Sequence, residues 1–253
     1  MVENYIRERL KKKKILLMTH IVMGYPNFDD SMEIVKQMVG AGVDLMELQI
    51  PFSEPMADGP VILRANQAAL YGGARVERCF EFAQEVSSRF DIPFLFMTYY
   101  NIIFKYGVER FVSRMADIGI KGAIVPDLPP EEGVAYLGAM AKRELSSIHI
   151  FSPATTDQRM EFLSAKTTGF VYCVARKGVT GKDTQFSGEL EQYLARCRKM
   201  THLPLAVGFG VKDRVDVEFL KGKADIAVVG SQTIRVMEEK GICAVGDFVE
   251  NLV

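Results

Sequence analysis

The sequence predicts an α/β protein, a single (β/α)8 TIM barrel over residues 1–253 with an extra N-terminal helix. Apolar runs of strand length recur along the chain, with amphipathic segments of helical length between them. Parallel strands need long crossover connections, so this alternation favours a parallel sheet. Eight such units in 253 residues favour closure into a barrel over an open sheet. No linker or shift in composition divides the chain, so one domain is expected.

The elements follow in order. A short helix over Asn4–Leu10 comes first, and the basic run behind it is interpreted as a solvated helix end. The expected strands are Ile15–Ile21, Asp44–Ile50, Pro93–Thr98, Gly122–Val125, Ser147–Phe151, Gly169–Val174, Pro204–Val207 and Asp225–Val229. The expected helices between them are Asp29–Val39, Val76–Arg89, Val108–Ile118, Glu131–Arg143, Asp157–Ala165, Gly188–Met200 and Val215–Lys221. Glu131 and Glu132 are expected in the first turn of their helix, where acidic residues suit the helix dipole.

Composition and missing motifs exclude several classes of function. A net charge of −1 gives no overall attraction to nucleic acid or to a membrane surface. The four cysteines share no metal-ligand spacing, and the three histidines lie far apart in the sequence. Neither a dinucleotide-binding G-x-G-x-x-G after the first strand nor a Walker motif occurs. No signal peptide and no apolar run of membrane-spanning length is found. We therefore expect a reduced, cytoplasmic, metal-free protein.

The residues with the clearest chemistry are two carboxylates around the second expected strand. Glu47 lies within the apolar run Leu45–Ile50, where a buried ionisable group needs a reason. Asp58 lies in the following loop, which contains three prolines and a glycine within ten residues. Glu47 could be a salt-bridged strand residue, and Asp58 a turn former or helix cap. A barrel enzyme presents catalytic groups where its strands end, so the two acids together favour an active site.

The loops after the seventh and eighth strands predict a phosphorylated substrate. They read Val207-Gly-Phe-Gly210 and Val229-Gly-Ser-Gln-Thr233. Glycines let backbone N–H groups approach an anion, and Ser231 can add a hydroxyl donor. In TIM barrels these two loops often hold phosphate. The longest loop, Arg176–Gly188, is rich in Gly and Thr and has the composition of a closing lid.

These motifs resemble the tryptophan synthase alpha subunit family. The matching segments are Met46–Pro60, Tyr99–Asn101, Ile124–Pro129, Tyr172 with Arg176–Gly181, Gly208–Gly210 and Gly230–Ser231. The resemblance implies retro-aldol cleavage of indole-3-glycerol phosphate to indole and glyceraldehyde 3-phosphate, a step in L-tryptophan biosynthesis. It also implies a beta-subunit partner in an alpha2beta2 assembly. Pyridoxal phosphate (PLP) would belong to that partner, and this chain would hold no cofactor.

The resemblance also implies roles for individual residues. Glu47 would be the general acid–base, Asp58 the partner of the indole N–H, and Tyr172 a neighbour of the reacting side chain. The implied substrate-binding residues are Tyr99, Thr180, Gly181, Gly208, Phe209, Gly210, Gly230 and Ser231. Of these, Thr180 and Gly181 would lie in the lid. The residues around the phosphate would be Gly208, Phe209, Gly210, Gly230 and Ser231, with Phe209 also near the indole.

The chemistry suits these residue types. Cleavage needs a proton on indole C3 and loss of a proton from the side-chain hydroxyl, which one carboxyl group can transfer. A fixed carboxylate beside the indole nitrogen stabilises the positive charge that develops there.

Four positions depart from the family pattern. Gln49 stands where glycine is usual, and Glu54 stands where aspartate is usual. His20 replaces a residue that is usually aromatic, and Ile102 replaces a frequent proline. Period-two geometry places Gln49 on the side of Glu47, where it could crowd the site or bond to Glu47. His20 is expected to be a packed pocket wall.

Three alternatives stay open on sequence grounds. The chain could be a stand-alone lyase that releases indole, or a non-catalytic subunit that activates the beta subunit. It could also share only the fold and carry out other chemistry on a sugar phosphate. The intact acid pair speaks against a non-catalytic subunit, and the specific loop motifs speak against other chemistry.

Overall fold

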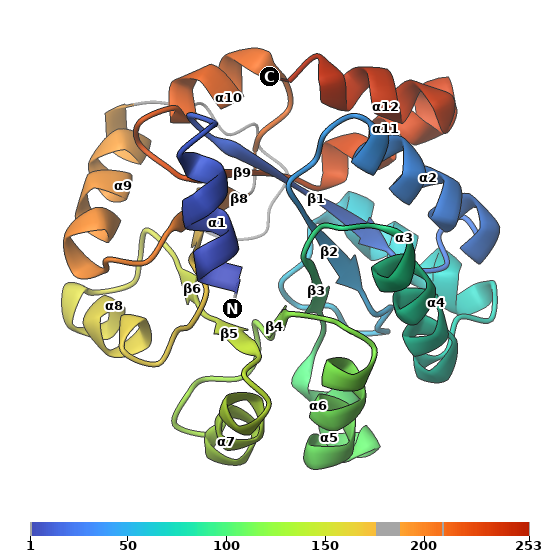
Figure 1. Ribbon diagram of the computed structural model, residues 1–253, viewed down its shortest axis with the longest axis horizontal. Coiled ribbons are helices and arrows are strands. Elements are labelled where there is room, and N and C mark those ends of the chain that lie inside the picture. Colours follow the sequence, from blue (N-terminus) through green and yellow to red (C-terminus); the bar gives the residue numbers. More distant parts are fainter. Residues whose placement is uncertain (1, 176–187, 209, 253) are drawn as a thin grey trace.

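The protein is a parallel β-barrel surrounded by helices (Figure 1). The computed structural model describes residues 2–175, 188–208 and 210–252. The strands are β1 (Leu16–Val22), β2 (Leu45–Gln49), β3 (Phe94–Met97), β4 (Gly122–Ile124), β5 (Ser146–Ile148), β6 (Ile150–Phe151), β7 (Val171–Val174), β8 (Leu205–Gly208) and β9 (Ile226–Val229). The helices are α1 (Val2–Leu10), α2 (Phe28–Gly40), α3 (Pro60–Tyr71), α4 (Val76–Arg89), α5 (Tyr100–Tyr106), α6 (Val108–Asp117), α7 (Val134–Lys142), α8 (Asp157–Ser164), α9 (Gly188–Met200), α10 (Arg214–Leu220), α11 (Ser231–Lys240) and α12 (Cys243–Glu250).

The barrel closes through a strand that is split in two. The sheet order is β5-β4-β3-β2-β1-β9-β8-β7-β6, and the pieces β5 and β6 are separated in sequence by His149 alone. β5 pairs with β4, whereas β6 pairs with β7. The amide of Tyr172 donates to the carbonyl of His149 at 3.0 Å and so bridges the break. The predicted barrel is therefore confirmed, with its fifth strand divided where it changes partner.

Several helices lie outside the predicted set: α3, α5, α11 and α12. α3 begins at Pro60, because proline is well tolerated in the first turn of a helix, where its missing N–H is not needed. The expected position of Glu131 and Glu132 in the first turn of α7 is wrong. That helix begins at Val134, after the turn around Gly133, and Glu131 instead pairs with Arg159 of α8. Among the described residues, no helix is long and apolar enough to span a membrane.

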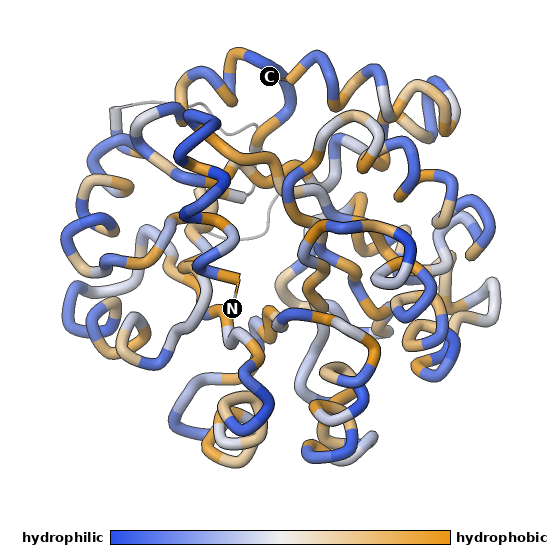
Figure 2. Tube along the Cα trace, viewed as in Figure 1, coloured by the Kyte–Doolittle hydropathy of each residue, from blue (hydrophilic) through white to orange (hydrophobic). Residues whose placement is uncertain are grey.

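The barrel interior is apolar at the end where the strands begin. One buried cluster joins inward residues of β1 to β5 and of β7 to β9 to Val2 and Ile6 of α1. Helix α1 thus covers this end of the barrel, as its place in Figure 1 shows. A second, larger cluster fills the space between the strands and the outer helices. Figure 2 shows hydrophobic strands inside and mixed helices outside. The end of the barrel where the strands begin is therefore filled mainly by apolar side chains, and Ser146 at the start of β5 is a buried polar exception.

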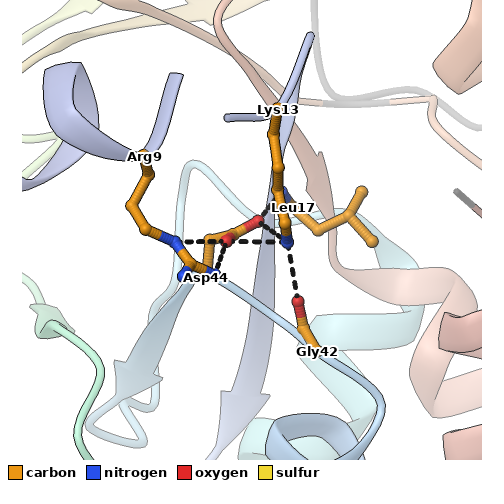
Figure 3. A network of polar contacts seen from close by, with 5 residues as sticks. All are labelled: Arg9, Lys13, Leu17, Gly42 and Asp44. Carbon is orange, nitrogen blue, oxygen red and sulfur yellow. Dashed lines mark hydrogen bonds and ion pairs between the residues drawn. The ribbon is translucent and has the colours of Figure 1, made fainter. Parts of the chain in front are cut away.

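Asp44 fixes α1 and the first two strands to each other (Figure 3). Its side chain is 0% exposed. Oδ1 accepts from Nη2 of Arg9 at 2.6 Å and from Nζ of Lys13 at 2.8 Å. Oδ2 accepts from the backbone N–H of Leu17 at 3.0 Å. The basic run behind α1, interpreted above as solvated, therefore supplies one cation to a buried carboxylate.

We expect Asp44→Ala to destabilise the protein by about 1–3 kcal/mol, because it leaves the buried N–H of Leu17 without an acceptor. Asp44→Asn should cost less, since an amide oxygen can still accept from Leu17 while Arg9 and Lys13 remain partly solvated. Urea unfolding measures both. Glu8→Gln, which removes an exposed ion pair with Lys11, is the control and should change little. Equal stability of Asp44→Ala and the unchanged protein would contradict a structural role for this cluster.

Candidate active site

A cavity of about 580 Å³ opens at the end of the barrel where the strands terminate. Among the predicted site residues, Glu47, Asp58, Tyr172, Gly210, Gly230 and Ser231 line it. Tyr99 and Gly208 lie outside its lining. Thr180, Gly181 and Phe209 lie outside the described residues. The structure thus brings both carboxylates and the predicted phosphate-binding loops to one hollow.

Glu47 is held by a histidine on the neighbouring strand. The parallel register of β1 and β2 places His20 beside Glu47. Nδ1 of His20 lies 2.9 Å from Oε2 of Glu47, and the two residues are 4% and 3% exposed. Burial lowers the pKa of His20, but its hydrogen bond to Glu47 and the charges of Glu47 and Asp58 outweigh burial and raise it. His20 is therefore a direct partner of Glu47, in addition to the expected pocket wall.

Asp58 is held by a different neighbour. Nε2 of Gln49 donates to Oδ2 of Asp58 at 2.6 Å. The sequence had placed Gln49 on the side of Glu47, and the structure gives it Asp58 as its hydrogen-bond partner. Burial raises the pKa of Asp58, while the hydrogen bond from Gln49 and the charge of His20 oppose that rise. Each carboxylate thus has its own polar partner.

The loop that carries Asp58 is built on Tyr99. Tyr99 is fully buried, its hydroxyl accepts from the backbone N–H of Ala57 at 3.1 Å, and its ring stacks on Phe52. The N–H of Phe52 in turn donates to Oδ1 of Asn66 on α3 at 2.9 Å. These contacts hold both ends of the proline-rich loop. Tyr99 is placed to orient Asp58.

Tyr172 fills space that only glycine leaves open. It lies on β7, and a Cβ atom added at Gly208 on β8 would lie 2.6 Å from its Cε1 and collide with its hydroxyl group. Burial raises the pKa of Tyr172 well above its usual value, and the charges of Glu47 and Asp58 act in the same direction. Its phenol therefore stays protonated and lies beside the acid pair. Gly208 makes room for this ring.

The opposite part of the cavity is suited to an anion. Gly230 is the N-cap of α11, whose first N–H groups have no partner within the helix. Gly210 has φ +135°, a backbone conformation that favours glycine. Lys212 and Arg235 line the same cavity and supply positive charge. Sequence reasoning missed these two basic residues, although each follows a glycine-rich loop by only a few positions.

The described residues contain no group of three or more His, Cys, Asp and Glu side chains placed to hold a metal ion. The polar groups of the cavity include two carboxylates, a histidine, a phenol, two basic side chains and the N-terminus of a helix. Together they can transfer protons and stabilise separate positive and negative charges on one ligand.

Comparison with known proteins identifies the family. A family profile described as tryptophan synthase alpha chain matches residues 6–246. The chain belongs to this family. The alpha chain of Desulforapulum autotrophicum is 73% identical over 252 residues and that of Syntrophotalea carbinolica 64%, each with 100% of both chains covered. A structure of Mycobacterium tuberculosis tryptophan synthase superimposes with a TM-score of 0.93 at 29% identity, covering 99% of this chain and 96% of that chain.

Membership in the tryptophan synthase alpha chain family confirms the predicted fold and function. A mutant alpha-subunit from Pyrococcus furiosus likewise superimposes with a TM-score of 0.86 at 29% identity, covering 94% of this chain and 97% of that one. The chain is a lyase of tryptophan biosynthesis that cleaves indole-3-glycerol phosphate.

Gly208→Ala should displace Tyr172 and destabilise the protein by about 1–3 kcal/mol, because overpacking a tight core position forces side chains off their rotamers. Unfolding in urea and turnover of indole-3-glycerol phosphate measure the two effects. Gly138→Ala on α7 is the matched control, since no atom lies within 4 Å of the added Cβ. It should be neutral or slightly stabilising. A Gly208→Ala protein with unchanged stability and turnover would show that Tyr172 does not depend on this glycine.

Proposed function

We propose that Glu47 and Asp58 divide the chemistry of indole-3-glycerol phosphate cleavage between them. The observation that carries the proposal is their joint position in one cavity, each with a separate polar partner. Glu47 transfers protons, and Asp58 supplies a fixed negative charge. The phosphate end of the substrate lies at the N-terminus of α11.

Glu47 performs both proton transfers. As an acid it protonates indole C3, which makes the ring an electron sink. As a base it accepts the proton of the side-chain hydroxyl while that carbon becomes an aldehyde. The C–C bond then breaks, and its electrons return to the indole ring. Oε1 of Glu47 has no hydrogen-bond partner within the described residues, so this oxygen is available for the substrate.

Asp58 stabilises the positive charge that spreads to the indole nitrogen. Its side chain accepts from Gln49 and lies in a loop pinned by Tyr99, so it is already oriented before substrate binds. Such preorganised charge is effective because it requires no rearrangement during the reaction. Tyr172 packs beside the reacting side chain, between the two ends of the substrate.

The phosphate group is bound by backbone N–H groups and basic side chains. The residues proposed for it are Gly210, Gly230 and Ser231, together with Lys212 and Arg235. A helix N-terminus favours an anion through its dipole and its unpaired N–H groups. The roles of Thr180, Gly181, Gly208 and Phe209 in substrate binding remain predictions from the family resemblance.

The proposed partner is a tryptophan synthase beta subunit that carries PLP and receives the indole, in an alpha2beta2 assembly. Two exposed apolar side chains support a protein contact at the active-site end of the barrel. Met56 in the loop after β2 is 73% exposed, and Phe104 on α5 after β3 is 69% exposed. We further propose that residues 1–253 form one domain. The cytoplasmic location stays a prediction.

Glu47→Gln should abolish turnover while leaving the affinity for indole-3-glycerol phosphate nearly unchanged, because glutamine keeps the shape but cannot exchange a proton. Asp58→Asn should retain a small residual rate. Loss of one preorganised electrostatic contact typically costs on the order of 10²–10³ in rate. Steady-state formation of indole, with and without added beta subunit, together with substrate binding measured by calorimetry, separates the two roles.

Those assays also test the alternatives. Turnover that is independent of added beta subunit would favour a stand-alone lyase, and no turnover under either condition would favour a non-catalytic subunit. A Glu47→Gln enzyme with unchanged turnover would remove Glu47 from the mechanism.

Gly230→Asp should weaken binding of glycerol phosphate on the order of 100-fold or more, because opposed like charges cost several kcal/mol. The fold should persist, since an added Cβ would lie 3.7 Å from Cβ of His20, an ordinary contact. Gly230→Ala adds the same carbon without the charge and is the control. Affinity measured by calorimetry should fall for the aspartate variant and hold for the alanine variant. Equal affinity in both would place the phosphate elsewhere.

A further inference from the structure

We propose that His20 is a positioning residue that orients the carboxyl group of Glu47 and serves as its charge partner inside the barrel. The inference rests on the proposed role of Glu47 as the group that transfers protons. It adds a second titratable side chain to the acid–base machinery.

The geometry places the two side chains in a fixed relation. His20 on β1 and Glu47 on β2 are register partners in adjacent parallel strands, and both line the cavity. Nδ1 of His20 and Oε2 of Glu47 are 2.9 Å apart. Rigid strands hold a pair more precisely than loops do. The hydrogen bond therefore restricts the carboxyl group and leaves Oε1 as the oxygen available to the substrate.

The atoms of the pair that have no hydrogen-bond partner also support a role for His20 in the site. Nε2 of His20 and Oε1 of Glu47 are both buried and have no hydrogen-bond partner within the described residues. Buried polar atoms normally have partners, so an exception in a cavity wall is suited to a ligand. A histidine with a purely structural role would be expected to have both ring nitrogens satisfied.

The electrostatic surroundings favour a charged pair. Ionised Glu47 in a buried position needs a cation or several donors nearby. His20 is its hydrogen-bond partner, and the other ionisable groups around the pair are Asp58 in the loop after β2 and Tyr172 on β7. Lys212 and Arg235 line the same cavity from the loop after β8 and from α11. A protonated His20 thus balances the charge of Glu47, one of the two carboxylates, at hydrogen-bond distance.

His20 can then support both states of Glu47. In the acid step, the O–H bond at Oε1 breaks, its proton goes to indole C3, and the carboxylate that remains is stabilised at Oε2 by Nδ1–H of His20. In the base step, Oε1 of that carboxylate takes the proton of the side-chain hydroxyl, and its O–H bond forms again. His20 keeps its own proton in both steps and so supports Glu47 as an acid and as a base.

Two substitutions of His20 test the inference by kinetics. His20→Asn places an amide nitrogen near the position of Nδ1 and keeps the hydrogen bond without a titrating charge. His20→Phe keeps the ring and removes both nitrogens. We expect the phenylalanine variant to lose kcat on the order of 10-fold to 100-fold, which is below the 10²–10⁴-fold typical of a general acid–base group itself. KM should change little, and the asparagine variant should be intermediate.

The pH profile separates positioning from packing. Removing the positive charge of His20 from the catalytic centre should move the acid limb of kcat to higher pH in both variants. A packing role would lower stability and leave the profile in place. Unchanged kcat and an unchanged acid limb in folded His20→Phe, or in His20→Asn where the phenylalanine variant does not fold, would overturn the inference.

A measurement without turnover provides an independent test. The chain has three histidines, His20, His149 and His202, so imidazole NMR signals can be assigned and titrated individually. The pKa of His20 should lie above its ordinary value and fall in Glu47→Gln, where burial acts without the opposing charge. Burial lowers the pKa of His149 to about 4, and this residue should not respond. A His20 signal that is the same with and without Glu47 would also overturn the inference.

The experiments distinguish a failure of the proposed function from a failure of the positioning role of His20. An active Glu47→Gln enzyme would refute the role of Glu47 in turnover, whatever the NMR signal of His20 shows. An inactive Glu47→Gln enzyme combined with an unresponsive His20 would refute only the positioning role.

Discussion

The parallel register between β1 and β2 is the constraint on which the rest of the site depends. At the beginning of these strands, Asp44 binds the N–H of Leu17, Arg9 of α1 and Lys13 after α1, which ties the strands to each other and to the helix that covers the barrel. Side chains repeat with period two along a strand, so this end fixes the other. Slippage by one residue would send Glu47 to the outer, apolar face and separate it from His20. The contacts of buried Asp44 at one end therefore help to fix where Glu47 and His20 lie at the other.

The interior of the barrel changes character along its axis. Apolar side chains fill the end under α1, and polar ones take over where the strands terminate. A polar layer is tolerated there because most of its members have a specific partner: His20 for Glu47, Gln49 for Asp58, and the backbone of Ala57 for Tyr99. Two of the atoms without a partner among the described residues, Nε2 of His20 and Oε1 of Glu47, belong to the cavity wall, where a ligand can complete them. Stability and function thus occupy opposite ends of one fold.

Local sequence signals were sufficient for the fold and for the acid pair. Alternating runs gave the strands, and an ionisable residue within an apolar run marked Glu47. What could not be predicted depends on register and on backbone direction. His20 and Glu47 are 27 residues apart, and nothing local pairs them. Helix α3 was not predicted, because Pro60 was assigned to the proline-rich loop, whereas it is the first residue of the helix. Lys212 and Arg235 gave no local signal of a shared site, since one lies in the loop after β8 and the other on α11.

The two carboxylates cannot be treated as independent groups. Burial raises the pKa of Asp58, and the negative charge of Glu47 adds to that rise, so the ionised form of Asp58 is lost at a higher pH than for an exposed aspartate. Gln49, His20 and Tyr99 act in the opposite direction through hydrogen bonds and charge. When Glu47 is neutral, its repulsion disappears and Asp58 ionises more readily. In the proposed mechanism the first step needs protonated Glu47 as an acid for C3 and ionised Asp58 as an anion for the indole nitrogen. The ionisation of Asp58 is therefore coupled to the proton that Glu47 carries during cleavage.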